Sequence, residues 1–213
     1  MLGHEMSNGF WRYRTDAEGH VTLTGYNGPG GAVCIPQYLA GRPVTRLADQ
    51  LFREDLRPIG QDGLPDNPVE AVVIPEGVEA IGAQAFFCCR SLQRVRLPQS
   101  LRTLGRDAFS FCETLEEIRL PASLQEIPEG AFEGCIRLQA AWLPDALHTI
   151  GERAFDGCWS LRATPWPKGL TCIDDYAFNS CALFAPQPLP RRNVYVGVDA
   201  FEGCCASAFT CAG

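Results

Sequence analysis

The chain has 213 residues, of which 46% are hydrophobic and 20% charged, and its formal net charge is −7. The acidic balance argues against nucleic acid as a ligand, because a phosphate backbone needs a basic footprint, and against an anionic membrane surface. No apolar run of about 18 residues occurs, so we expect no membrane insertion. We also see no signal peptide and no anchor, because no basic segment at the start is followed by an apolar core.

Two short alternating segments open the chain. Residues Phe10–Arg14 and Val21–Thr24 each alternate between apolar and polar side chains, and the turn-forming residues Asp16–Gly19 lie between them. This pattern is typical of a β-hairpin. We therefore predict that residues 1–33 form an N-terminal hairpin cap, which would cover the strand edges of the structure that follows.

Residues 34–68 read as one irregular copy of a unit that becomes regular later in the chain. After Phe52 the next strand is delayed by the segment REDLRPIGQDGLPDNP, which covers residues 53–68. Insertions of this kind can be functional, although a linker between an imperfect first coil and the regular ones is the simpler interpretation. Asp62 and Asp66 lack the spacing of a calcium-binding EF-hand loop, so we read them as solvated charges. The role of the insertion is left open.

From residue 69 to 205 one 23-residue unit occurs six times without an insertion. The unit reads L-x-x-I-x-L-P-x-x-L-x-x-I-G-x-x-A-F-x-x-C. Its invariant columns are Pro75, Pro98, Pro121, Pro144, Pro167 and Pro190; Phe86, Phe109, Phe132, Phe155, Phe178 and Phe201; and Cys89, Cys112, Cys135, Cys158, Cys181 and Cys204. A fixed period of this length predicts a repeat solenoid, in which each unit buries its apolar side against its neighbours.

Each unit contains a signal for one short strand. Ile118 and Leu120 alternate with Glu117 and Arg119, as in a half-buried strand, and Pro121 then ends the strand because it has no N–H to donate. The Leu-x-x-Ile-Gly segment is predicted to turn the chain, and the Ala-Phe-x-x-Cys segment to form a short helical turn. Successive coils would lie about 4.8 Å apart, with a parallel β-sheet on the concave face.

The last unit departs from the others. Phe184–Leu189 is predicted to be a terminal strand in which Pro186 and Pro188 remove backbone donors, so that the stack ends there. Residues 206–213 form a C-terminal tail that is still fairly apolar. A homodimer through the C-terminal end is therefore one expectation for this chain.

The eleven cysteines do not suggest a disulfide framework. The six cysteines of the repeat are expected to point inward and in parallel, as inert buried thiols whose sulfurs do not face one another. The adjacent pairs Cys88-Cys89 and Cys204-Cys205 do not have the spacing of a zinc site. We expect no metal and no cofactor, and the thiol or disulfide state of Cys88, Cys205 and Cys211 stays open.

Catalytic patterns are not visible either. The three histidines, His4, His20 and His148, are not placed by the repeat near a common serine or cysteine. The GPGG segment at residues 28–31 lacks the lysine and helix of a phosphate-binding loop. We therefore expect a protein that is not an enzyme.

The repeat resembles the BspA-type leucine-rich repeats of bacterial surface proteins, most specifically between Pro75 and Cys204. Residues Val21–Phe52, which contain the segment GRPVT, are similar to the opening unit of that family. The resemblance implies an α/β-type leucine-rich repeat solenoid with residues 1–213 as a single domain. It also implies an adhesion module for a protein partner, such as a host or matrix protein, and a cell-surface or secreted location; the missing leader leaves a cytoplasmic location open.

The outward positions of the predicted concave face give a candidate binding site. The residues that we select are Arg94, Arg96, Glu117, Arg119, Trp142 and Arg162. Arginine and aromatic side chains are the usual anchors of protein interfaces. The alternative for Trp142 is that it only covers its neighbours and shields the sheet. The alternative for the whole chain is a structural spacer or self-assembly unit.

Overall fold

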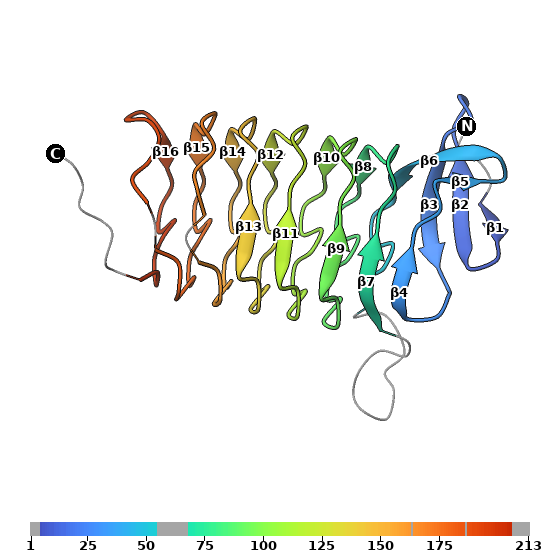
Figure 1. The fold of residues 1–213 in the computed structure, drawn as a ribbon, viewed down its shortest axis with the longest axis horizontal. Coiled ribbons are helices and arrows are strands. Elements are labelled where there is room, and N and C mark those ends of the chain that lie inside the picture. Colours follow the sequence, from blue (N-terminus) through green and yellow to red (C-terminus); the bar gives the residue numbers. More distant parts are fainter. Residues whose placement is uncertain (1–4, 55–67, 163, 186, 206–213) are drawn as a thin grey trace.

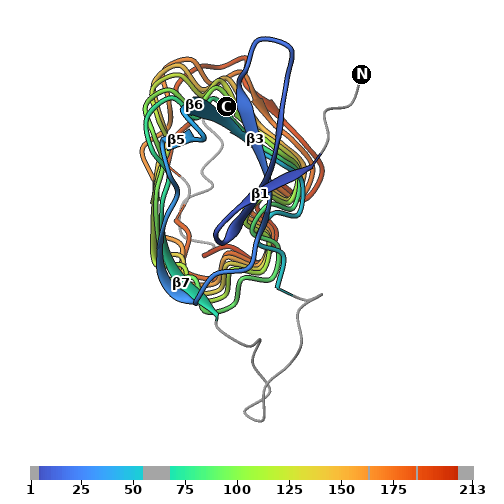
Figure 2. The same ribbon diagram turned by 90° about the vertical axis from the view of Figure 1, so that its right-hand side faces the viewer.

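The computed structural model describes residues 5–54, 68–162, 164–185 and 187–205, and in them the chain winds into a stack of coils along one long axis (Figure 1). Seen down that axis, the outlines of successive coils nearly coincide (Figure 2). The predicted solenoid is therefore confirmed. Residues 55–67 of the predicted insertion at residues 53–68, and the tail at residues 206–213, lie outside the described residues.

One side of the coils carries the predicted parallel sheet. Its order is β13 (Ala140–Trp142), β11 (Glu117–Arg119), β9 (Arg94–Arg96), β7 (Val69–Val73) and β4 (Gly31–Cys34). All of these neighbours are parallel, so residues one repeat apart, such as Glu117 and Ala140, lie side by side.

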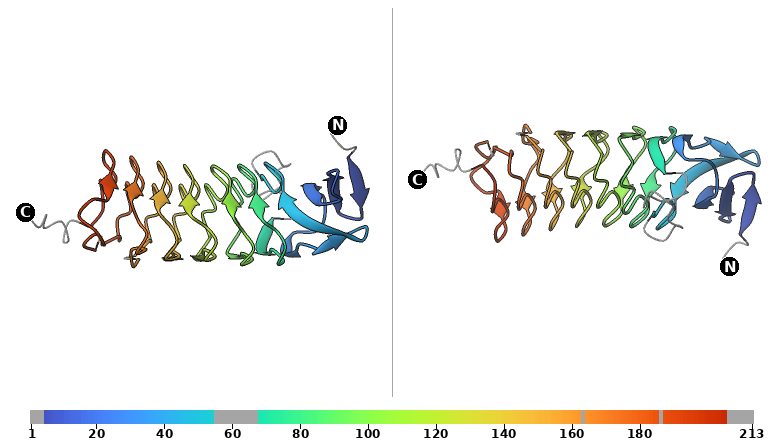
Figure 3. Two further views of the ribbon diagram at one scale, coloured as in Figure 1. Left: turned by 90° about the horizontal axis from the view of Figure 1, so that it is seen from above. Right: turned by 90° about the horizontal axis from the view of Figure 1, so that it is seen from below.

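A second row of strands lies on another side of the coils, where we predicted only a turn (Figures 1 and 3). Each regular coil adds two residues to it, and these strands are β8 (Ala80–Ile81), β10 (Thr103–Leu104), β12 (Glu126–Ile127), β14 (Thr149–Ile150), β15 (Cys172–Ile173) and β16 (Tyr195–Val196). Glycine follows several of these strands because the coils approach closely. A Cβ atom on Gly105 would lie 2.3 Å from the backbone nitrogen of Ala83.

The predicted helical turns are wrong, because no helix occurs in the described part of the chain. The Ala-Phe-x-x-Cys segments are turns in which backbone N–H groups point alternately to the next coil and back into the same turn. The N–H groups of Phe109 and Phe111 donate to carbonyls of the next coil, at 2.9 and 2.7 Å, whereas those of Ser110 and Cys112 donate within their own turn. A segment that gives every second N–H to its neighbour has too few left for a helix.

The interior contains a row of stacked phenylalanine rings. The ring centroids of Phe86, Phe109, Phe132, Phe155 and Phe178 follow one another at 4.9 to 5.6 Å, with interplanar angles of at most 12°. All five side chains are fully buried. No single coil could bury such a ring, so the core exists only through stacking.

The N-terminal end of this row is covered by the predicted hairpin. Strands β2 (Trp11–Thr15) and β3 (Val21–Tyr26) pair antiparallel, and β3 continues into the second row of strands through β6 (Arg42–Leu47). Two short strands lie beside them, β1 (Met6–Asn8) against β2 and β5 (Tyr38–Leu39) against β6. The rings of Trp11 and Tyr26 lie 6.0 and 5.4 Å from that of Phe52, the first ring of the row.

The C-terminal end is closed differently from the prediction. The described residues of the segment 184–189 form no strand, so the predicted terminal strand is wrong. Instead the Phe184 ring folds inward and stacks on Phe178 at 4.7 Å, and Trp166 meets the same ring edge-on at 5.6 Å. Phe201 of the last coil also stacks on Phe178, at 5.5 Å, so an aromatic cluster rather than a strand closes this end.

The buried cysteines have a role that the sequence did not reveal. Each thiol donates to the carbonyl oxygen of the buried phenylalanine in the preceding coil, as Cys135 does to Phe109 at 3.1 Å and Cys158 does to Phe132 at 3.1 Å. The sulfurs of Cys112, Cys135, Cys158 and Cys181 point the same way and do not pair, and these four buried cysteines are free. Burial raises the pKa of the Cys204 thiol to about 12 and holds the pKa of Cys135 far above its usual value, so these groups stay protonated.

Truncating the middle of the ring row should be costly. We expect Phe132→Ala to lower the free energy of unfolding by about 3–5 kcal/mol, because it opens a cavity that neighbouring coils share. Phe201→Ala should cost less, because this ring is only partly buried and lies at the end of the row. Denaturant unfolding followed by circular dichroism measures both. Equal losses of free energy at the two positions would contradict an interior in which each ring is buried by the neighbouring coils.

The thiol ladder predicts two classes of cysteine in solution. In the native protein a neutral thiol reagent should modify exposed Cys34 and Cys205 quickly, while the fully buried thiols of Cys89, Cys112, Cys135, Cys158 and Cys181 react only on unfolding. Denatured, unreduced protein should show at least about eight free thiols. A lower count by mass spectrometry would mean that the ladder is oxidised.

Candidate functional site

The candidate site lies on the exposed side of the five-stranded sheet. Strand alternation decides which side chains face outward: Ile118 and Ala141 are buried in the core, and their neighbours in β11 and β13 point to solvent. Of the six residues predicted for this site, all are exposed. We call Arg94, Arg96, Glu117, Arg119 and Trp142 the sheet-face patch.

The centre of the sheet-face patch is a stacked pair. Arg119 and Trp142 are direct partners in the register of β11 and β13, and the Arg119 guanidinium carbon lies 3.7 Å from the centroid of the Trp142 ring. Trp142 is still 38% exposed. The indole therefore does lie against a neighbouring side chain, as the alternative interpretation held, and the same contact fixes the orientation of both groups.

The other members of the sheet-face patch are placed by the same register. Arg94 is the partner of Glu117 in the next strand, and Arg96 is the partner of exposed Val73. Arg162 lies one coil beyond Trp142, where its N–H donates to the Gln139 carbonyl at 3.2 Å, but it belongs to no strand. The sheet thus brings five of the six predicted residues together, and Arg162 lies outside it.

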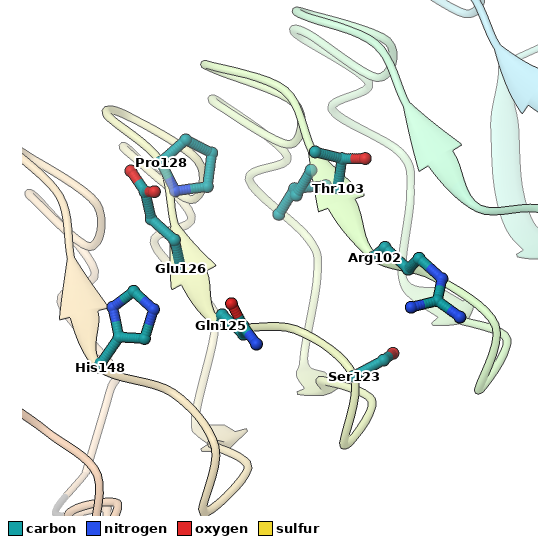
Figure 4. Close-up of a pocket in the computed structure, with 8 residues that line it drawn as sticks. Arg102, Thr103, Ser123, Gln125, Glu126, Pro128 and His148 are labelled. Carbon is teal, nitrogen blue, oxygen red and sulfur yellow. The ribbon is translucent and has the colours of Figure 1, made fainter.

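A shallow pocket on the second row of strands offers a comparison (Figure 4). Its lining contains a serine and a histidine, Ser123 and His148. The Ser123 hydroxyl donates to the backbone carbonyls of Gln99, at 3.0 Å, and of Leu101. The Nδ1 atom of His148 lies 3.0 Å from the Thr149 hydroxyl. The two side chains therefore do not form a nucleophile and base pair.

One group of possible metal ligands occurs among the described residues. Asp16, Glu18 and His20 gather in the turn of the hairpin, with their ligand atoms within 4.8 Å of one another. The Asp16 carboxylate accepts the backbone N–H groups of Glu18 and His20, at 3.0 and 2.8 Å, and the His20 bond is the main reason why the pKa of Asp16 is lowered. This network is that of an ordinary turn closed by its first aspartate.

An exposed aromatic side chain was not singled out from the sequence. Trp159 is 57% exposed and lies in the turns that follow the buried phenylalanines, away from both rows of strands. The sequence does contain a signal for Trp159, because the two preceding coils carry Ile136 and Glu113 at the same repeat position. Two residues earlier in the repeat, glycine occurs in consecutive coils, at Gly134 and Gly157.

The parallel stack, the 23-residue coils and the exposed sheet define a leucine-rich repeat protein. Residues 58–185 match six copies of the BspA type leucine rich repeat region, and the chain belongs to this family. Leucine-rich repeat proteins are generally scaffolds for protein interaction. A comparison with curated proteins gives no match.

Solved structures agree with this assignment. The T. pallidum leucine rich repeat protein TpLRR is 30% identical, with a TM-score of 0.83 over 94% of this chain and 89% of that one. A leucine rich cell surface protein of Faecalibacterium prausnitzii is 27% identical, with a TM-score of 0.80 over 96% of this chain and 53% of that one. The chain thus spans about half of the second protein. No helix among the described residues is both long and apolar enough to cross a bilayer.

Proposed function

We propose that this protein is a non-enzymatic interaction module that binds a protein partner through the sheet-face patch. The observation that carries the proposal is the Arg119–Trp142 stack, an exposed aromatic and cationic pair on a sheet held by parallel strands. Arginine and tryptophan are the side chains that most often dominate the affinity of an interface.

The geometry also favours binding energetically. Backbone bonds between strands, such as Leu120 N–H to the Trp142 carbonyl at 3.1 Å, fix the spacing of the patch. A patch that is already ordered loses little conformational entropy when a partner docks. Arg94 and Arg96 add charge beside the stack, while Glu117 limits the patch to partners that tolerate an acidic group. Arg162 would extend the contact by one coil.

Family membership supports a proposal for the setting of this interaction. One similar structure belongs to a cell surface protein, and we propose an adhesive role at the cell surface or outside the cell for this chain as well. The partner would then be a host or matrix protein. Residues 1–213 would act as one domain, because the ring row and its two aromatic ends form a continuous interior.

A second candidate function is self-assembly through the C-terminal end. Strand β16 is the last strand of the four-stranded sheet in the described part of the chain, and its residues Tyr195 and Val196 are exposed, as is Val198 nearby. An apolar strand edge can pair with a second copy. This observation supports the spacer or assembly alternative.

The partner-binding proposal is tested by capture and then by direct measurement. Immobilised protein is incubated with host-cell or matrix extract, captured proteins are identified by mass spectrometry, and the dissociation constant is measured with the purified partner. We expect Trp142→Ala and Arg119→Ala each to raise the dissociation constant about tenfold or more, as interface anchors do.

Two matched variants serve as controls for that measurement. Arg102→Ala removes an exposed arginine directly before β10 in the second row of strands, and Tyr38→Ala removes an aromatic side chain that is 60% exposed near the hairpin. Both should bind like the unchanged protein. If the double variant at Arg119 and Trp142 keeps the original dissociation constant for every confirmed partner, the sheet-face patch is not the binding site.

Self-assembly makes a separate prediction. If the C-terminal end mediates association, light scattering at high protein concentration should report a dimer, and Val196→Glu should return it to a monomer by placing a charge on the exposed edge of β16. A monomer across the whole concentration range would remove this alternative and leave the interaction proposal unaffected.

A further inference from the structure

A short groove crosses the turns that follow the buried phenylalanines, on a different part of the coils from the sheet-face patch. Its lining residues are Phe111, Glu113, Glu133, Gly134, Ile136, Asp156, Gly157 and Trp159. Two exposed aromatic side chains belong to it, Phe111 at 36% and Trp159 at 57%. Neither the proposed function nor the core of the repeat gives these side chains a task.

The groove exists because glycine occupies one repeat position in two consecutive coils. This position, directly before each buried cysteine, has a positive φ in every regular coil and carries Cys88, Phe111, Gly134, Gly157, Ser180 and Gly203 in turn. The Phe111 ring lies over Gly134, where a Cβ atom would be 2.5 Å from its Cδ1. At Gly157 the nearest atom to a Cβ would be the Cα of Gly134, at 3.7 Å, so the backbone there is open.

Two carboxylates without a basic partner belong to the lining. Glu133 and Asp156 occupy the same repeat position in adjacent coils, and neither forms an ion pair with any residue that the structure describes. Asp156 accepts one hydrogen bond, from the Asn179 amide at 3.0 Å. Burial raises the pKa of both groups, and the Asp156 charge raises the pKa of Glu133 further. The Arg153 charge lowers the pKa of both groups, but the groove lining itself contains acidic and no basic side chains.

The arginine whose charge acts on both carboxylates is already engaged. Arg153 pairs with Glu152 at 2.6 Å and lies over the Tyr176 ring, 5.2 Å from its centroid. On the other side, Glu113 is paired with Arg90 at 3.2 Å. A cation that enters the groove from outside would be the first full counter-charge for Glu133 and Asp156.

We propose that this groove binds a lysine or arginine side chain from a basic segment of a protein partner. The methylene groups would lie along the open backbone at Gly157 and against Ile136, and the cation would lie between the two carboxylates and the Trp159 ring. Aromatic faces and carboxylates both attract a cation, and they do so most strongly when it is partly desolvated. This site is independent of the sheet-face patch.

A metal ion fits the groove less well. A calcium ion takes six to eight oxygen ligands, whereas the unpaired ligands here are two carboxylates beside aromatic and aliphatic side chains. Those apolar walls are suited to the long methylene stem of a basic side chain, which covers apolar surface while its charged end stays polar.

The test uses three short blocked peptides and the whole protein. The probes are acetyl-Gly-Gly-Lys-Gly-Gly-amide, its arginine counterpart, and a norleucine counterpart that keeps the methylene groups without the charge. The readout is the indole N–H signal of Trp159 in a nitrogen-15 correlation spectrum, assigned by its absence in Trp159→Phe. We expect saturable shifts with the lysine and arginine peptides and none with the norleucine peptide.

Charge-matched variants separate the groove from general attraction to an acidic protein. Glu133→Gln and Asp156→Asn should each weaken binding of the basic peptides about fivefold or more, whereas Glu116→Gln, which removes the same charge from an exposed position directly before β11, should change it less than about twofold. Gly157→Ser keeps both carboxylates, uses a residue that this repeat position already carries at Ser180, and should weaken binding by filling the open backbone.

Three results would overturn the proposal. One is an absence of saturable shifts with both basic peptides while the spectrum shows a folded protein. Another is an equal loss of affinity in Glu133→Gln and Glu116→Gln, which would indicate non-specific attraction. The third is equal binding of the norleucine peptide, which would indicate an apolar groove without cation recognition. None of these results bears on the Arg119 and Trp142 variants.

Discussion

The bond from each buried phenylalanine N–H to the alanine carbonyl of the next coil sets the geometry of the whole protein. Phe109 donates to Ala131 at 2.9 Å and Phe132 donates to Ala154 at 2.8 Å. These bonds hold successive coils at the spacing of neighbouring strands, about 4.8 Å, and the rings then stack at 4.9 to 5.6 Å. The thiol of each repeat cysteine adds a second bond to the phenylalanine carbonyl. From Phe86 to Phe201 these contacts recur every 23 residues. The first ring, Phe52, keeps them with Phe86 across the longer segment that contains the insertion, with Phe52 N–H to the Ala85 carbonyl at 2.7 Å and the rings at 5.0 Å.

Each phenylalanine ring of the row is buried by the coils on both sides, so the two ends of the row must be covered by other side chains. At the first coil, Trp11 and Tyr26 from the hairpin cover Phe52, so the cap contributes rings of its own rather than another coil. At the other end, Phe201 of the last coil stacks on Phe178, and Phe184 and Trp166 pack against both rings without a strand. Both ends therefore stop the stack by aromatic packing, while the edge at β16 keeps exposed apolar residues. The stability of such an array is close to a sum of local contacts between neighbours, so the middle of the row has the most to lose.

Much of this architecture could be predicted from the sequence because the columns of the repeat are unbroken. The solenoid, the parallel sheet, the hairpin and the inward row of rings all follow from period and alternation.

The two-residue strands such as Thr149–Ile150 could not be predicted, because two residues are too short to show an alternation. The predicted helical turn was wrong because the residue spacing of Ala-Phe-x-x-Cys suits two structures equally well. One is a helical turn, and the other is a turn in which every second N–H donates to the next coil. The column of Arg119 and Trp142 predicted their adjacency, but their stack depends on rotamers that sequence does not specify. The groove at Gly157 was missed because it depends on three coils together.

The departures from the repeat carry the functional information in a protein of this kind. The core columns are nearly uniform, since each must satisfy the same neighbour contacts, and they cannot distinguish one partner from another. At outward positions the strand column changes from Arg96 and Arg119 to Trp142, and the column before cysteine changes from Phe111 to Gly134 and Gly157. Both changes fall in the middle coils, where backbone bonds on either side hold the side chains in a fixed array. A flat cationic and aromatic face and a negatively charged groove attract different groups. A single partner that carries an acidic apolar surface and a separate basic segment could occupy both sites, and the two contacts would then add in affinity as linked sites do.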